Sequence, residues 1–249
     1  MKNKHLFFSL LMVLASLLNA CHKPLFISSH TNHFYTISNQ YAADSAMVQM
    51  LRPYKIGVDT QMQVVIGYSD VPLTKAQPES TLGNFMADAQ LKKAQSIDRK
   101  VVGSVVNYGG VRLPYVAPGA LTRGKMYELM PFDNVLTIVE MPGSDLRQFC
   151  DFMATRKGWP ISGITYVIKD KSAADILVDG LPINDNVVYK VAMGDYIANG
   201  GDNADFIRPL KRKNTGVFIR DAMIEYVEQL QAKNIHLHPN IEKRVQYAE

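Results

Sequence analysis

The chain has 249 residues, of which 47% are hydrophobic and 20% charged, which suits one globular domain or two small ones. Its formal net charge is +4, and Lys2 and Lys4 supply two of those charges at the N-terminus. So small a net charge excludes the broad basic surface with which proteins hold nucleic acids.

The first twenty residues have the pattern of an export signal. Lys2 and Lys4 precede an apolar run, residues 6–18, which is too short to span a bilayer. The following residues, Leu-Asn-Ala-Cys, resemble the cleavage site of bacterial lipoproteins. We therefore expect residues 1–20 to be a lipoprotein signal peptide and Cys21 to carry a lipid that anchors the chain to a membrane outside the cytoplasm, on its periplasmic or cell-surface side. The alternative is plain secretion, with cleavage after Ala20.

Residues 21–45 are polar and have no strong period, so we interpret them as a tether, and residues 46–249 as the folded domain. Cys150 is the only other cysteine, and a single thiol cannot form an internal disulfide. Because Cys150 lies in an apolar-periodic run, we expect a buried core residue rather than a nucleophile.

The remaining patterns predict both strands and helices. Runs rich in β-branched residues predict strands, and apolar residues at helical spacing predict helices, one capped by Ser80 or Thr81 and one capped by Ser144 and ended by Gly158. A strand followed by a loop is predicted over 62–73, and a strand that enters a glycine turn over 101–110. The other predicted strands are 121–127, 135–141, 164–170 and 187–197, and the predicted helices are 80–95, 143–158 and 221–233. Without a strict βαβ alternation, this order indicates an α+β fold.

Three stretches stand out in chain order. They are STLGNFMADA (80–89), NYGGVR (107–112) followed by PFDN (131–134), and DYIANGGDNADF (195–206). Together they resemble the C-terminal domain of the 5'-nucleotidase family, over roughly residues 59–219. The resemblance implies a layered α/β/β/α-type sandwich of mixed sheets and helices, which holds the nucleoside of the substrate.

The resemblance also assigns roles to residues. Phe132 and Tyr196 correspond to two aromatics that sandwich the base, a stacking worth roughly 1–3 kcal/mol per base. Tyr196 stands where phenylalanine is common; its ring would still stack, and its hydroxyl could reach a base edge or water. Asp202, in a double-glycine turn, corresponds to the carboxylate that accepts from the ribose hydroxyls. The alternatives are that both rings belong to the core and that Asp202 caps its own turn.

Four further positions match the family's site: Asn107, Gly110, Arg112 and Asn134. Arg112 would direct its guanidinium at ribose or phosphate oxygens, although an arginine at a strand end is often a surface ion-pair partner.

The first stretch, with Gly83 and Asn84, we interpret as mainly structural. One departure is upstream of it, where the family often supplies a phosphate-binding arginine. Here that place holds Ala76, with Lys75 adjacent, so the sequence does not decide whether the site binds phosphate.

The sequence lacks the motifs of the family's catalytic half. Complete 5'-nucleotidases cleave the phosphate ester in a separate metallophosphoesterase domain with two metal ions, whose D-x-H and G-N-H motifs do not occur here. The Gly-Asp-x-x-Asp at residues 201–205 belongs to the glycine turn, and the His236–His238 pair has no accompanying carboxylate cluster. We therefore expect no catalytic residue, metal ligand or cofactor in this chain, and two divalent metals in a partner catalytic chain.

Three hypotheses follow from this pattern. The chain binds nucleotides for a separately encoded metallophosphoesterase chain, in nucleotide catabolism. Alternatively, it is a non-catalytic, lipid-anchored nucleotide-binding protein. In the third, it is an autonomous hydrolase whose site the motifs do not reveal, or a scaffold with a degenerate pocket.

Overall fold

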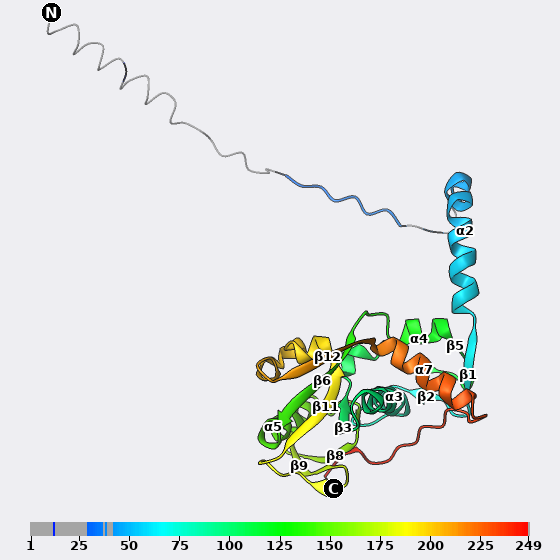
Figure 1. The fold of residues 1–249 in the computed structure, drawn as a ribbon. Coiled ribbons are helices and arrows are strands. Elements are labelled where there is room, and N and C mark those ends of the chain that lie inside the picture. Colours follow the sequence, from blue (N-terminus) through cyan, green and yellow to red (C-terminus); the bar gives the residue numbers. More distant parts are fainter. Residues whose placement is uncertain (1–11, 13–28, 37, 39–41, 249) are drawn as a thin grey trace, which may run out of the picture. The chain divides into compact units, whose positions relative to one another are not determined.

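The computed structural model describes residues 12, 29–36, 38 and 42–248 (Figure 1). The chain divides into two compact units, residues 1–49 and 50–249. Of the predicted signal peptide only Met12 is among the described residues, and Cys21 lies outside them. Among the helices in the described part of the chain, none is both long and apolar enough to cross a bilayer.

A five-stranded mixed sheet organises the unit formed by residues 50–249. Strand β11 pairs in parallel with β3 and antiparallel with β6. In spatial order the strands are β12 (Arg212–Phe218), β6 (Val135–Pro142), β11 (Val188–Gly194), β3 (Val101–Val105) and β7 (Ile161–Ser162).

The two faces of this sheet pack into two separate apolar cores. Leu136 and Ile138 of β6 belong to a core that they share with helices α3 (Thr81–Ile97) and α7 (Ile219–Gln231). Val139 and Met141 point to the opposite face, as the period of two in a strand requires, and pack with helix α5 and a second sheet. Helix α5 spans Gly143–Thr155, and the second sheet runs β10 (Leu181–Pro182), β9 (Ser172–Val178), β8 (Ile164–Lys169), β13 (Val245–Tyr247). The predicted layered α+β fold is confirmed.

One long helix and several short elements complete the described part of the chain. Helix α2 (Ser45–Met62) precedes the first strand and has no buried residue. Two small antiparallel pairs are β1 (Val65–Ser69) with β5 (Gly119–Thr122), and β2 (Leu73–Thr74) with β4 (Tyr115–Val116). The remaining helices are α4 (Arg123–Leu129), α6 (Asp195–Ala198) and the 3₁₀ turns η1 (Tyr108–Gly110), η2 (Gly201–Asn203) and η3 (Asp205–Ile207).

Helix α3 follows its predicted pattern closely. Ser80 is the N-cap, and its side-chain oxygen accepts from the backbone N–H of Gly83 at 3.1 Å. The apolar residues Leu82, Phe85, Met86 and Ala89, which the helical spacing places on one face, are all fully buried. Local capping and periodicity therefore determined this helix correctly.

Several predicted boundaries are wrong, among them the following three. Residues 123–127 do not continue a strand but form α4, because Thr122 caps the turn by accepting from Lys125 N at 3.2 Å and Met126 and Leu129 are buried together. Likewise, the strand predicted over 187–197 ends at Gly194, where α6 begins. Ser144 is not the cap of α5, since the helix already begins at Gly143.

Cys150 lies on the buried face of α5, as predicted. Burial in the apolar core raises the pKa of its thiol, which keeps the thiolate from forming. This environment is that of a core residue and not of a nucleophile.

Candidate functional site

Sheet pairing brings the separated motifs to one end of the five-stranded sheet. Because β11 and β6 are antiparallel, with Gly194 opposite Leu136, the end of β11 lies beside the start of β6. The parallel partner β3 ends at the same edge, so the glycine turn after it arrives there as well. Segments from the second and third motifs are thereby placed around a common space.

That space is a cavity of about 320 Å³, within the range of small-molecule sites. It is lined by Asn107, Gly109, Gly110, Arg112, Phe132, Asn134, Tyr196 and Asp202. All seven residues selected from the sequence are therefore among its lining residues. Sequence reasoning missed Gly109, the first of the glycine pair whose second member it selected.

Two aromatic residues that line the cavity, Phe132 and Tyr196, are accessible to solvent. The Phe132 side chain is 39% exposed, and the Arg112 guanidinium carbon lies 5.2 Å from its ring centroid. Tyr196 is 46% exposed and lies against the backbone of Gly201. A Cβ at Gly201 would come within 2.5 Å of the Tyr196 ring, so the ring can occupy this position only because residue 201 is a glycine. Neither ring is a core residue.

The loop that carries Phe132 is held by Arg220, a buried residue of α7. Its guanidinium donates to Phe132 O at 3.2 Å, to Met130 O at 3.4 Å and to Asp133 Oδ1 at 3.0 Å. The same group lies 4.1 Å from the Tyr127 ring centroid. Sequence reasoning missed Arg220, since nothing in its local pattern indicates contact with a loop 87 residues earlier.

Asp202 also lines the cavity, in a turn with left-handed backbone. Its φ is 55°, and Gly200 before it and Asn203 after it also have positive φ. The carboxylate accepts from Asn107 Nδ2 at 2.8 Å and from the Tyr196 hydroxyl at 3.0 Å. The Tyr196 hydroxyl, for which the sequence suggested a base edge or water as partner, reaches across the turn to Asp202.

Comparison with known proteins assigns this arrangement to a family. Residues 65–211 match the family described as 5'-nucleotidase, C-terminal domain. The chain belongs to the 5'-nucleotidase C-terminal domain family. Curated relatives include a 5'-nucleotidase of Vibrio cholerae (24% identity, covering 83% of this chain and 38% of the relative) and Protein UshA of Yersinia enterocolitica (26%, 79% and 36%). The chain thus spans under two fifths of the length of these two relatives.

Solved structures agree on the fold. The chain is similar to the 5'-nucleotidase precursor of Thermus thermophilus, with a TM-score of 0.69, 24% identity, and coverage of 81% of this chain and 43% of the other. NAD nucleotidase of Haemophilus influenzae gives a TM-score of 0.63 at 21% identity, covering 82% and 41%. At these identities the likeness shows a shared fold alone.

In this 5'-nucleotidase C-terminal domain, Lys75 lies near Arg112, a residue that lines the cavity. Its ammonium donates to Val111 O at 2.8 Å and lies 4.1 Å from the Tyr108 ring centroid. Burial, and then the positive charge of Arg112, lower the pKa of Lys75. Two cations are therefore held near each other beside the predicted nucleoside site.

Gly83 and Asn84 lie outside the cavity lining. Asn84 donates to Glu79 Oε1 at 2.7 Å and to Asn240 O at 2.8 Å, which ties the start of α3 to the C-terminal segment. A Cβ at Gly83 would approach Pro160 Cγ to 2.8 Å. These contacts fit the structural interpretation of the first motif.

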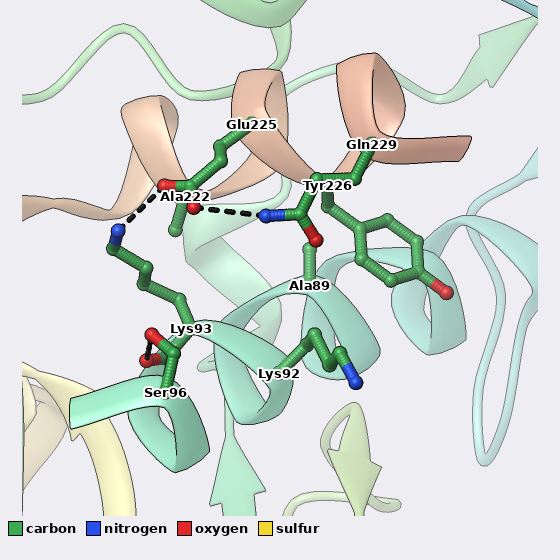
Figure 2. Close-up of a pocket in the computed structure, with 8 residues that line it drawn as sticks. All are labelled: Ala89, Lys92, Lys93, Ser96, Ala222, Glu225, Tyr226 and Gln229. Carbon is green, nitrogen blue, oxygen red and sulfur yellow. Dashed lines mark hydrogen bonds and ion pairs between the residues drawn. The ribbon is translucent and has the colours of Figure 1, made fainter. Parts of the chain in front are cut away.

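Three features outside the candidate site are a hollow between two helices, the ion pair of Arg123 and the His236–His238 pair. Figure 2 shows a small hollow between α3 and α7, bridged by Lys93 and Glu225, whose volume of about 40 Å³ is too small for a nucleoside. Arg123 pairs with Glu228 of α7 at 3.1 Å. His236 and His238 are exposed, and within the described part of the chain no three His, Cys, Asp or Glu side chains are grouped to hold a metal ion.

Proposed function

We propose that this chain is a nucleotide- or nucleoside-binding, substrate-specificity domain of a 5'-nucleotidase. The observation that carries the proposal is the single cavity lined by all seven selected residues. A base would stack between Phe132 and Tyr196, the ribose hydroxyls would bond to Asp202, and Asn107, Asn134 and the Gly110 backbone would supply polar contacts. The pair Lys75 and Arg112 would attract the phosphate.

The proposal is tested by calorimetric titration of the soluble chain from residue 22 with adenosine and with AMP. We expect both to bind and AMP to bind more tightly. Arg112→Ala should weaken AMP roughly 10-fold while weakening adenosine less, because a charge-assisted contact to phosphate contributes about 1.5–3 kcal/mol. Arg147→Ala removes an exposed arginine that pairs with Asp185 away from the cavity, and serves as the control. Absence of any binding to the wild type would contradict the proposal.

We further propose that hydrolysis, in nucleotide catabolism, requires a separately encoded metallophosphoesterase chain that carries two divalent metals. The missing D-x-H and G-N-H motifs support the placement of nucleotide binding and catalysis on two different chains. Phosphate release from AMP with Mn²⁺ should stay at the blank level for this chain alone and rise when the partner chain is added. Release by the purified chain alone would overturn the division and favour an autonomous hydrolase. Ligand binding with no stimulation by any partner would favour a lipid-anchored binding protein.

The N-terminal pattern supports a proposal about location. Residues 1–20 would be removed as a signal peptide, Cys21 would carry the lipid, residues 21–45 would form the tether and residues 46–249 the binding domain, displayed at the periplasmic or cell surface. One relative, from Listeria monocytogenes, is named Cell wall protein Lmo0130 (31% identity over 140 residues, covering 50% of this chain and 18% of the relative). Metabolic labelling with palmitate should mark the wild type and not Cys21→Ser, and equal labelling of both would refute lipidation at Cys21.

A further inference from the structure

We propose that the Tyr196 hydroxyl is a positioning group for the Asp202 carboxylate, and that it makes the site select a ribonucleoside over the corresponding 2'-deoxyribonucleoside. The inference deepens the proposed function and rests on it. The ligand chemistry at issue is a pair of neighbouring hydroxyls, the cis-diol of ribose.

Tyr196 and Asp202 are joined by two hydrogen bonds through one oxygen atom. The hydroxyl donates to Asp202 Oδ1 at 3.0 Å and accepts from the Asp202 backbone N–H at 3.2 Å. The second carboxylate oxygen, Oδ2, accepts from Asn107 Nδ2 at 2.8 Å. Both oxygens of the carboxylate are therefore held, by different partners, before any ligand arrives.

The backbone at this position needs such support. Asp202 and Asn203 have φ values of 55° and 66°, in the left-handed region that is unfavourable for most residues other than glycine. The hydroxyl of Tyr196 bonds to both the backbone and the side chain of Asp202, so it fixes the turn and the rotation of the carboxylate together. A second tie comes from Arg156, whose Nη2 donates to Asp202 O at 3.2 Å.

The number of acceptor positions left free on the Asp202 carboxylate then favours a ligand with two neighbouring hydroxyls. A carboxylate offers about four acceptor positions, two on each oxygen. One position on each oxygen is taken by Tyr196 and by Asn107, which leaves one on each for a ligand. Two acceptors at a fixed spacing match two neighbouring hydroxyls, and a ligand with one hydroxyl leaves one of them without a partner. A carboxylate free to rotate would adapt to a single hydroxyl and discriminate less.

The ring itself does not depend on the hydroxyl. The ring packs closely against the backbone of Gly201, where a Cβ would collide with it. A phenylalanine at position 196 would therefore keep the same ring position and the same stacking face. Removing one oxygen atom therefore separates the positioning role of Tyr196 from its role as a wall of the base slot.

The test compares Tyr196→Phe with the wild type in titrations with adenosine and 2'-deoxyadenosine. We expect the wild type to prefer adenosine, and the preference to fall by roughly 3- to 10-fold in the variant, because loss of one positioning hydrogen bond has about that effect. The loss should come from weaker adenosine binding, with 2'-deoxyadenosine nearly unchanged. Tyr247→Phe, which removes an exposed hydroxyl in β13 outside the cavity, is the matched control.

The ratio of the two dissociation constants is the readout that a merely structural role would not move. If Tyr196→Phe lowers the unfolding midpoint but leaves this ratio at the wild-type value, the inference is wrong and the proposed function stands. If both ligands weaken equally, the hydroxyl supports the cavity as a whole and the inference is also wrong. A wild type that binds neither ligand refutes the proposed function, and the inference with it.

Discussion

Replacing Phe132 with alanine is expected to weaken adenosine binding by roughly 10- to 100-fold, because it removes one of the two stacking surfaces offered to the base. The ring is accessible in the free protein, so the variant loses a ligand contact and little of the core. Isothermal titration of wild type and variant measures the change directly. Phe132→Trp keeps an aromatic face and should retain most of the affinity.

The matched control is Tyr115→Ala, which removes an exposed aromatic ring in β4 that does not line the cavity. Adenosine affinity should be the same as in the wild type. If Phe132→Ala binds as tightly as this control, Phe132 is not a wall of the base slot. The free energy of unfolding should change by less than about 1 kcal/mol in both variants, as is usual for exposed positions.

Gly163→Ala is expected to have the largest effect on stability. Gly163 links β7 to β8, and hence the five-stranded sheet to the four-stranded one, with a φ of +74°. A Cβ there would lie 2.1 Å from Val102 O, a contact that requires the backbone to move. We expect the free energy of unfolding to fall by about 3–5 kcal/mol, the range reached when strain and overpacking combine.

Gly180→Ala separates the effect of backbone strain from the effect of overpacking. Gly180 has nearly the same φ, +76°, but nothing lies within 4 Å of its Cβ position. This variant should lose only the conformational cost of a left-handed alanine, about 1–2 kcal/mol. Urea titrations give both values from the unfolding midpoint at constant slope. Equal losses in the two variants would show that the close contact with Val102 O contributes nothing.

Local sequence patterns were sufficient to predict elements that are stabilised by contacts between near neighbours in the chain. Ser80 and the apolar face of α3 predicted that helix because an N-cap and a period of 3.6 depend only on near neighbours. The strand predicted over 121–127 failed because a run this short does not distinguish a strand from a helix by its apolar period. The cap at Thr122, a local signal that the prediction overlooked, decided for a helix.

For this protein the sequence by itself determined the family, the fold class and the residue types of the candidate site, since short motifs with glycines and aromatics in a fixed order are specific. Only the tertiary structure decided how those residues meet. Pairing of β11 with β6 and β3 places Phe132, Tyr196 and Asn107 around one cavity. It also brings Asn107 to Asp202, and the pairing of β12 with β6 brings Arg220 to the Phe132 loop. Hydrogen bonds between side chains and distant segments depend on three-dimensional distances, which strand pairing sets and local sequence does not encode.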